Sequence, residues 1–324
     1  MRFVIFGAGA IGGVLGARLH QAGLDVALIA RGAHLEAIRR DGLTLLTPVE
    51  RVTLQLPVAS DPAGTGWSGD DVVLLATKSQ DTVAALTALR AAAGTAVPVV
   101  CVQNGVENER VALRLMDHVF GAVVMAPTAH LEPGTVEAYG AELSGMIDVG
   151  RYPDGVDQVC AEVCAALAAS RFASHPAPDI MRRKYAKLLL NLGNAVHALC
   201  EPGERRDELA ELAREEGETA LTAAGIEHVA PEITDVEGRW AQMGVRDIDG
   251  RRRAGSSTWQ SLARGAGALE TDYLNGEIVL QGRLHGVATP VNEALCRLAA
   301  RAARERRAPA SIPAADVLAV AAAA

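Results

Sequence analysis

The glycine motif GAGAIG at residues 7–12, which directly follows the apolar run RFVIF, most constrains the fold of this chain. Glycines in the spacing GxGxxG, placed between a β-strand and an α-helix, are typical of dinucleotide-binding folds. The first glycine permits a tight turn, the second lets a pyrophosphate approach the backbone, and the third allows the helix to pack closely on the sheet. The alternative is a glycine-rich turn without a ligand. We expect phosphate binding by Gly7, Ala8, Gly9, Ala10, Ile11 and Gly12.

The first half of the chain alternates apolar runs with helical patterns, starting with a helix over 10–23 that ends at Gly23. Uninterrupted apolar runs are typical of parallel strands buried on both faces. Such runs lie at 2–6, 25–30, 71–77 and 97–103. Later strands, some of them antiparallel, are predicted at 119–126, 135–139 and 146–150.

The second half is dominated by helical patterns after the proline-containing connector at 172–179. The helices are predicted at 180–199, 204–224, 256–264, 269–283 and 290–307, with a short Ala-rich helix at the end. The predicted fold is therefore α/β, with an N-terminal Rossmann-type, doubly wound parallel sheet followed by an all-helical C-terminal domain. We place the nucleotide-binding domain at 1–176 and the substrate and catalytic domain at 177–324.

Composition narrows the class of partner. The 324 residues carry a net charge of −8, which argues against nucleic acid as a general partner. No apolar run reaches the roughly 18 residues that a membrane helix needs, and the N-terminus enters a strand without a signal-peptide pattern. Five scattered cysteines form no metal-site spacing and suit a reducing compartment. We expect a cytoplasmic protein without membrane partner or metal, and the sequence leaves a homodimer open.

Arg31 stands at the end of the second predicted strand and bears on the choice of cofactor. Sites for NAD usually place an acidic residue there to bond the ribose 2′-hydroxyl, whereas an arginine suits the 2′-phosphate of NADP. The alternative is a solvated surface arginine, which is common in an arginine-rich chain. The position favours NADP.

Two loops follow predicted parallel strands at the edge of the sheet where ligands bind in open α/β folds. The loop TKSQDT carries Lys78, and the loop QNG carries Asn104 and Gly105. A lysine there reaches anionic groups, an asparagine both donates and accepts hydrogen bonds, and a glycine permits positive φ. Plain turn chemistry explains each loop equally well.

The stretch RRKYAKLLLNLGNAV (182–196) contains two of the three lysines of the chain beside an apolar run. Lys184, Lys187, Asn191 and Asn194 share one helical stripe. A solvated helix face is the usual explanation of such a stripe. The apolar surroundings favour a buried helix instead, where ammonium and amide groups need partners or a ligand.

Taken in order, these motifs resemble the ketopantoate reductase (2-dehydropantoate 2-reductase) family. The matching elements run from residue 3 to about residue 292 and comprise GAGAIG, Arg31, TKSQDT, QNG, KLLLN, SST, and ETDYLNG followed by HGVATPVN. The resemblance implies NADPH-dependent reduction of a 2-keto acid, 2-dehydropantoate, to a 2-hydroxy acid in pantothenate biosynthesis.

The resemblance also implies roles for individual residues. Lys187 matches the general acid, Asn191 a substrate-binding asparagine and Ser257 the serine that binds the substrate carboxylate. Glu270 matches the active-site glutamate, which serves catalysis and contacts the cofactor. Lys78 and Asn104 match cofactor-side residues, and Asn104 also faces the substrate. Lys184 has no counterpart with a role.

Two departures from the family pattern concern the substrate half. Ser261 stands where the family usually carries an acidic residue, and Ala195 stands where a second substrate asparagine is expected. The departures leave open a relative that reduces another 2-keto acid. A protein of another class, an NADP-binding sensor that has lost catalysis, is the further alternative. Without the resemblance, Ser256, Ser257 and Glu270 would be interpreted as helix caps and a solvated face.

Overall fold

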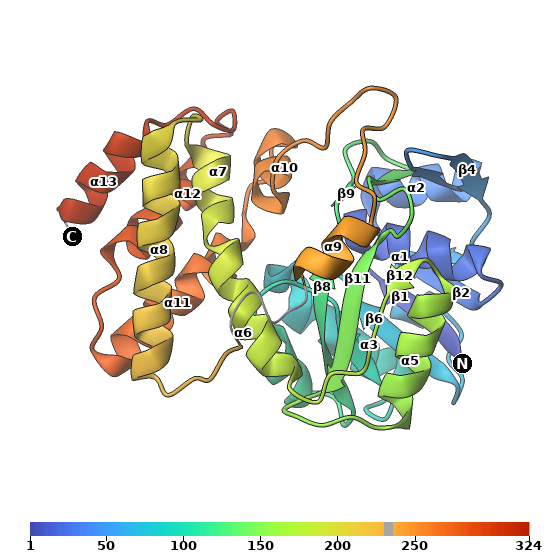
Figure 1. Cartoon of the computed structure of the whole chain (residues 1–324). Helices are drawn as coiled ribbons and strands as arrows, with labels where there is room; N and C mark the ends of the chain where they lie inside the picture. The colour runs from blue at the N-terminus through green and yellow to red at the C-terminus, as the bar shows by residue number, and fades with distance from the viewer. Residues whose placement is uncertain (230–235, 324) are drawn as a thin grey trace. The chain divides into compact units, whose positions relative to one another are not determined.

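The computed structural model describes residues 1–229 and 236–323 (Figure 1). The chain divides into two compact units. The first comprises the described residues of Met1–Arg183 and Glu232–Arg253, and the second comprises those of Lys184–Pro231 and Ala254–Ala324. The sequence predicts a single boundary near residue 176, whereas the division falls after Arg183 and a later segment returns to the first unit.

The first unit is built on an eight-stranded sheet with the order β12-β11-β8-β7-β6-β1-β2-β5. All neighbouring strands are parallel except β8 and β11, which pair antiparallel, and this confirms the predicted parallel sheet. The strands are β1 (Arg2–Phe6), β2 (Asp25–Ile29), β5 (Val58–Ala59), β6 (Asp71–Leu75), β7 (Val99–Cys101), β8 (Val119–Met125), β11 (Gly145–Arg151) and β12 (Phe172–Ala173).

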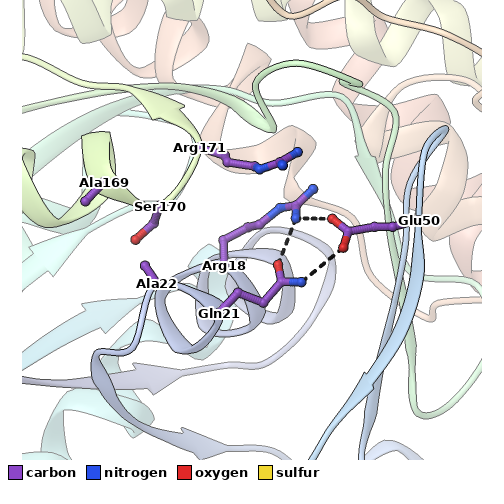
Figure 2. Close-up of a pocket in the computed structure, with 7 residues that line it drawn as sticks. All are labelled: Arg18, Gln21, Ala22, Glu50, Ala169, Ser170 and Arg171. Carbon is purple, nitrogen blue, oxygen red and sulfur yellow. Dashed lines mark hydrogen bonds and ion pairs between the residues drawn. The ribbon is translucent and has the colours of Figure 1, made fainter.

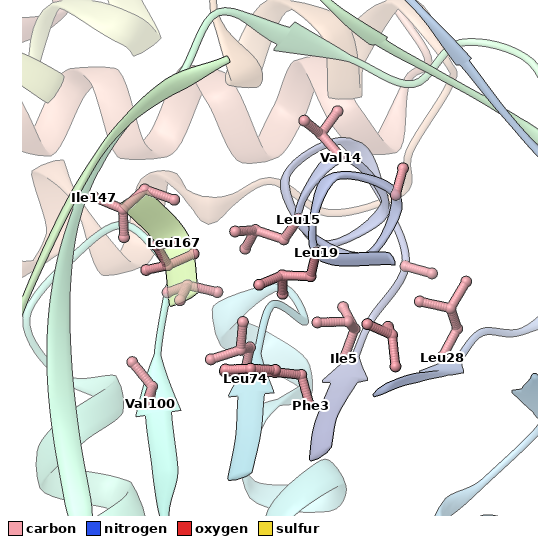
Figure 3. Close-up of a cluster of buried hydrophobic side chains, with 14 of the residues drawn as sticks. Phe3, Ile5, Val14, Leu15, Leu19, Leu28, Leu74, Val100, Ile147 and Leu167 are labelled. Carbon is pink, nitrogen blue, oxygen red and sulfur yellow. The ribbon is translucent and has the colours of Figure 1, made fainter. Parts of the chain in front are cut away.

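Helices cover both faces of this sheet, which explains why its central strands are apolar at every position. In β1, Phe3 and Ile5 enter one buried cluster, and Val4 and Phe6 enter another, because alternate side chains point to opposite faces. Figure 3 shows the first cluster, where α1 and α5 pack on the sheet. The helices are α1 (Ala10–Gln21), α2 (Gly32–Asp41), α3 (Thr82–Ala93), α4 (Asn108–Leu113) and α5 (Gln158–Ala169), with 3₁₀ turns η1 (Pro62–Gly64) and η2 (Ser79–Asp81).

A second sheet of the first unit was not anticipated. It has the order β4-β3-β10-β9 and contains β4 (Arg51–Leu54), β3 (Leu43–Leu46), β10 (Thr135–Ala138) and β9 (Thr128–Ala129). The predicted strand at 135–139 therefore belongs to this sheet, where it pairs in parallel with β3, about ninety residues earlier in the chain. It packs near α1, since a side chain at Gly13 would meet Val136.

The segment that returns to the first unit begins with α9 (Val236–Gln242), in a region that the sequence assigns to the helical domain. Tertiary contacts hold it there. Arg239 is almost fully buried and donates two hydrogen bonds, of 2.9 and 2.8 Å, to the carboxylate of Asp148 on β11. Ile248 is buried in a cluster with Leu46 and Tyr139 of the first unit. Figure 1 shows α9 beside β11.

We expect an Asp148→Asn variant to lose about 3–5 kcal/mol of the free energy of unfolding, because the buried guanidinium of Arg239 would lose the carboxylate to which it donates two hydrogen bonds. Chemical denaturation measures this. The control is Glu142→Gln, which removes the exposed pair that Glu142 forms with Arg246 at 3.4 Å and should leave the midpoint nearly unchanged. Equal midpoints for the two variants would contradict the role of Arg239.

The second unit is helical, as predicted. The 180–199 region, however, is two helices: α6 ends at Asn191, Leu192 interrupts it, and α7 begins at Gly193. The helices are α6 (Ile180–Asn191), which begins in the first unit, α7 (Gly193–Leu199), α8 (Glu204–Ala223), α10 (Ser257–Ala263), α11 (Asn275–His285), α12 (Pro290–Arg304) and α13 (Ala314–Ala322), with a 3₁₀ turn η4 (Glu270–Tyr273).

Within the described ranges, no helix combines the length and the apolar character needed to cross a membrane. All five cysteines are free thiols. The described residues also contain no cluster of side chains that could hold a metal ion.

Candidate active site

The glycine loop has the geometry that the sequence predicts. Gly7 has a φ of 106°, and a side chain there would lie 2.8 Å from the backbone nitrogen of Thr77. A side chain at Gly12 would lie 2.1 Å from the carbonyl oxygen of Gly7, so only glycine fits. Gly9, by contrast, would meet no protein atom within 4 Å. The chain therefore leaves open space at the one glycine that precedes the first turn of α1.

That open space is suited to a phosphate group. Gly9 is the N-cap of α1 and has no side chain, so no side-chain oxygen accepts hydrogen bonds from the first backbone N–H groups of the helix. These N–H groups have no acceptor within the helix, and the positive end of the helix dipole points the same way. No acidic residue occupies the first turn. The loop therefore fits the pyrophosphate of a dinucleotide.

His34 on α2 forms a hydrogen bond to the backbone of the glycine loop, and the sequence motifs did not predict a role for this residue. The backbone N–H of Gly134 donates to Nδ1 of His34 at 2.8 Å, so the ring proton lies on Nε2 and is donated to the carbonyl oxygen of Ala8 at 2.7 Å. Burial lowers the pKa of His34 and keeps the ring neutral. His34 thus connects the glycine loop to Gly134, which directly precedes β10 of the second sheet, and no local sequence pattern predicts this connection.

Arg31 lies at the end of β2, as the NADP prediction requires, but it has a neighbour of opposite charge. Its guanidinium forms an ion pair with Asp81 at 2.6 Å, and the arginine side chain is 82% exposed. Asp81 belongs to the loop TKSQDT that follows β6. The end of β2 therefore presents both a cation and a carboxylate to a ligand.

The loops after β6 and β7 are joined by buried hydrogen bonds. Thr82 accepts from Gln103 at 2.9 Å and donates to Asn108 at 2.7 Å, and Asn108 donates to the carbonyl of Asn104 at 3.1 Å. Asn108 also donates to Ser79, next to Lys78, at 3.2 Å. Gly105 has a φ of 81°, as its place in a turn predicts. The network fixes the backbone on either side of Lys78 and Asn104.

In the second unit, Lys187 lies in the last two turns of α6 and is mostly buried. Burial and, to a smaller extent, the charge of Lys184 lower the pKa of Lys187 from 10.5 to about 7, although the carboxylate of Glu270 acts in the opposite direction. Lys184 is itself 4% exposed and Glu270 9% exposed. An ammonium group poised near neutral pH can give up a proton, as a general acid must.

Asn191 and Asn194 remain neighbours although Leu192 interrupts the helix between them. The side-chain amide of Asn194 donates to the side-chain oxygen of Asn191 at 3.3 Å. Ala195, at the position of the expected second asparagine, is 1% exposed. Asn194 therefore supplies an amide beside Asn191, one residue earlier than in the family pattern.

The interruption at Leu192 is held by a buried polar network that sequence reasoning also missed. Asn275, fully buried, donates to the carbonyl of Leu192 at 3.2 Å and to the side chain of Asn292 at 2.9 Å. Asn292 donates to Glu216 at 2.8 Å, and Glu216 accepts from the backbone of Val291 at 2.8 Å. The asparagines of ETDYLNG and ATPVN thus shape the end of the helix that carries Lys187.

Ser257 opens α10, whose N-cap is its neighbour Ser256. Ser256 accepts from the backbone of Trp259 at 3.2 Å and donates to the carbonyl of Asn194 at 3.2 Å, which ties α10 to α7. Ser261 is 5% exposed and donates to the carbonyl of Ser257 at 3.0 Å. Ser261 thus satisfies the backbone of its own helix, where the family usually has an acidic side chain.

A separate pocket of about 220 Å³ lies in the first unit near the C-terminal end of α1 (Figure 2). Its lining includes Arg18, Glu50 and Arg171. Arg18 is almost fully buried, pairs with Glu50 and donates to Ser144 at 2.8 Å. None of the predicted site residues lines this pocket. We interpret it as the surroundings of a structural ion pair that joins α1 to the second sheet.

Comparison with known proteins decides the family. The protein-family model described as "Ketopantoate reductase PanE/ApbA" matches residues 3–154, and the family model for the C-terminal part of the same reductases matches residues 179–303. The chain belongs to the ketopantoate reductase family. The resemblance drawn from the motifs is confirmed, and with it an oxidoreductase of Rossmann-type fold.

Relatives in the ketopantoate reductase family match over nearly the full length. The chain is 32% identical to the 2-dehydropantoate 2-reductase of Halobacterium salinarum, over 94% of this chain and 100% of the relative. It is 31% identical to that of Archaeoglobus fulgidus, over 92% of this chain and 96% of the relative.

Solved structures agree with the ketopantoate reductase fold. A PanE/ApbA family ketopantoate reductase from Ralstonia eutropha is 31% identical, with a TM-score of 0.79 over 95% of this chain and 100% of the other. A D-mandelate dehydrogenase in complex with NADH and anilino(oxo)acetate is 22% identical, with a TM-score of 0.80 over 94% of this chain and 99% of the other. At that identity the second likeness concerns the fold alone.

Proposed function

We propose that this protein reduces 2-dehydropantoate to pantoate with NADPH, the reaction for which its relatives are named. The observation that carries the proposal is Lys187, a mostly buried lysine whose pKa of about 7 suits proton donation to a ketone. Burial that lowers the pKa of a lysine disfavours its charged form, so a lysine with only a structural role would not contribute to stability at this position.

The cofactor is bound, in this proposal, by the first unit. The backbone of Gly7, Ala8, Gly9, Ala10, Ile11 and Gly12 holds the pyrophosphate, because the space beside Gly9 is open. Arg31 takes the 2′-phosphate, and Lys78 and Asn104 serve the remainder of the cofactor from the loops after β6 and β7. By analogy with the family, Glu270 also contacts the cofactor.

The chemical step needs a hydride and a proton. Bound NADPH supplies the hydride for the keto carbon. The ammonium of Lys187 stabilises the negative charge that develops on the keto oxygen and then donates its proton there, leaving a neutral amine. Glu270 favours the protonated lysine. Asn191 and Asn104 orient the substrate by their amides, and the hydroxyl of Ser257 donates to the substrate carboxylate.

A related 2-keto acid is the second candidate, because Ser261 and Ala195 are both buried in positions where the family has polar groups for the substrate. The test is oxidation of NADPH with 2-dehydropantoate and a panel of 2-keto acids that lack its hydroxyl or its methyl groups. The highest kcat/KM should belong to 2-dehydropantoate. A higher value for another acid would transfer the proposal to that acid, and tight NADPH binding without any turnover would identify a sensor.

Arg31 and Asp81 should affect cofactor choice in opposite directions. Arg31→Ala should weaken NADPH binding by about ten- to a hundredfold, since a hydrogen bond to a charged group is lost, and should spare NADH. Asp81→Asn removes the carboxylate beside Arg31, so the ratio of the Kd for NADH to the Kd for NADPH should rise by about two- to fivefold. Titration of each variant with each cofactor measures both changes.

An unchanged Kd for NADPH in Arg31→Ala would remove the assignment of NADP. A fall of the same ratio in Asp81→Asn would show that Asp81 helps to bind NADPH through another group.

We place the protein in the cytoplasm, since five free thiols suit a reducing compartment and the relatives are biosynthetic enzymes. Its substrate is a small 2-keto acid, and a homodimer remains compatible with the chain.

A further inference from the structure

The chain segment 239–253 contains five arginines, and one of them differs from the rest. Arg239 is bound by Asp148, Arg246 pairs with Glu142 at 3.4 Å, and Arg251 pairs with Glu137 at 3.3 Å. Arg252 is exposed, so water solvates its charge. Arg253 is half-buried. Arg253 is therefore the arginine of this segment whose guanidinium is partly desolvated and forms no ion pair with a described carboxylate.

The surroundings of Arg253 are polar but neutral. Its Nε donates to the backbone carbonyl of Thr128 on β9 at 3.1 Å. Among the described residues, no carboxylate forms an ion pair with it, and burial lowers its pKa. Glu137 on the neighbouring strand is engaged, because it accepts from the hydroxyl of Tyr139 at 2.7 Å and pairs with Arg251.

The partial burial of the Arg253 guanidinium destabilises the fold unless an anion binds to it. A guanidinium has five N–H donors in a planar fork that matches the two oxygens of a carboxylate or phosphate, and the bond to Thr128 uses one of them. Desolvating a charge without a counter-charge destabilises a protein, so partly buried cations are usually paired. Arg253 belongs to the first unit and binds β9, which lies against α1, the helix that begins at the phosphate-binding loop.

We propose that Arg253 is an anion-binding residue of the reaction, which takes an oxyanion of the bound reactants at the end of β9. The inference rests on the proposed function for the identity of the anion. That function offers two sources with the same chemistry: the carboxylate of the 2-keto acid and a phosphate of the dinucleotide. Neither the family resemblance nor the sequence motifs assign Arg253 a role.

The experiment compares Arg253→Ala with Arg252→Ala, which removes the neighbouring exposed guanidinium and serves as the matched control. NADPH is titrated into each protein alone, and pantoate is titrated into each protein saturated with NADP⁺. Arg253→Ala should weaken one of the two ligands by about ten- to a hundredfold, as expected for a lost charge-assisted hydrogen bond. Arg252→Ala should change neither. Arg253→Lys keeps the charge but not the fork and should fall between.

Each outcome has one meaning. Weaker pantoate with unchanged NADPH identifies the carboxylate as the anion, and weaker NADPH identifies a phosphate. If both affinities in Arg253→Ala equal those of Arg252→Ala, the proposal is overturned. If the unmodified protein binds NADPH but neither binds pantoate nor reduces 2-dehydropantoate, the proposed function fails. The NADPH titration then still tests Arg253 by itself.

Discussion

A Lys187→Met variant should lose about 10²- to 10⁴-fold in kcat for 2-dehydropantoate, the usual contribution of a general acid. Methionine fills a similar volume without the ammonium, so the second unit should fold normally. The Kd for NADPH should stay within about twofold of the unmodified value, because the cofactor-binding loop belongs to the first unit. Steady-state kinetics and a cofactor titration on the same preparation measure both quantities. Near-normal turnover would remove Lys187 from the mechanism.

The pH dependence gives an independent test of the same group. The protonated lysine is the acid, so kcat should be constant below a pKa of about 7 and fall about tenfold per pH unit above it. Lys184→Gln removes a like charge that lowers the pKa of Lys187, and the fall should therefore move to higher pH. The control is Arg182→Gln, which removes an exposed cation two residues before Lys184. A fall that stays in place in Lys184→Gln would contradict this electrostatic coupling.

Gly9→Ala should nearly abolish NADPH binding without destabilising the fold. The added methyl group would meet no protein atom within 4 Å, and Gly9 has an ordinary negative φ of −70°. The space that it fills is the one proposed for the pyrophosphate, so we expect Kd to rise by at least about a hundredfold, comparable to the loss of several charged hydrogen bonds. Fluorescence titration with NADPH and thermal denaturation test the two halves of the prediction.

Gly12→Ala is the matched comparison. Its methyl group would lie 2.1 Å from the carbonyl oxygen of Gly7, so this variant should lose both stability and cofactor affinity. Unchanged NADPH affinity in Gly9→Ala would mean that the pyrophosphate does not approach the loop at that residue. A destabilised Gly9→Ala would mean that the loop is more tightly packed than its geometry indicates.

Local sequence patterns predicted the strands whose burial is visible directly in their amino-acid composition. Strands β1, β2, β6 and β7 are buried on both faces, and uninterrupted apolar runs reveal such strands directly. The segment that begins with α9 belongs to the first unit and not to the helical domain predicted for it, because the buried pair of Arg239 with Asp148 joins residues 91 apart in sequence. Periodicity contains no information about such a partner.

The break in the predicted helix 180–199 has a similar origin. KLLLNLGNAV has the periodicity of a continuous helix, and Gly193 alone does not stop one. At the break, the buried side-chain amide of Asn275, which lies 83 residues further along the chain, donates a hydrogen bond to the carbonyl of Leu192. A rule based on neighbouring residues could not anticipate this bond.

At the candidate site, the motifs predicted individual residues but not the charged groups that surround them. Glycine spacing predicted the loop at residues 7–12 in detail, because steric constraints act locally. The pairing of Arg31 with Asp81 and the influence of Lys184 on Lys187 required the fold. Lys184, for which the sequence offered no role, thus has a proposed one in setting the pKa of Lys187.

The most direct test of the central claim is the fate of the hydride. NADPH carrying two deuterium atoms at nicotinamide C4 is incubated with the protein and 2-dehydropantoate, and the product is analysed by mass spectrometry and NMR. The account predicts pantoate with one deuterium at C2, formed in equal amount to the NADP⁺ released. NADP⁺ without labelled pantoate, or no reaction at all with a protein that binds both ligands, would contradict it.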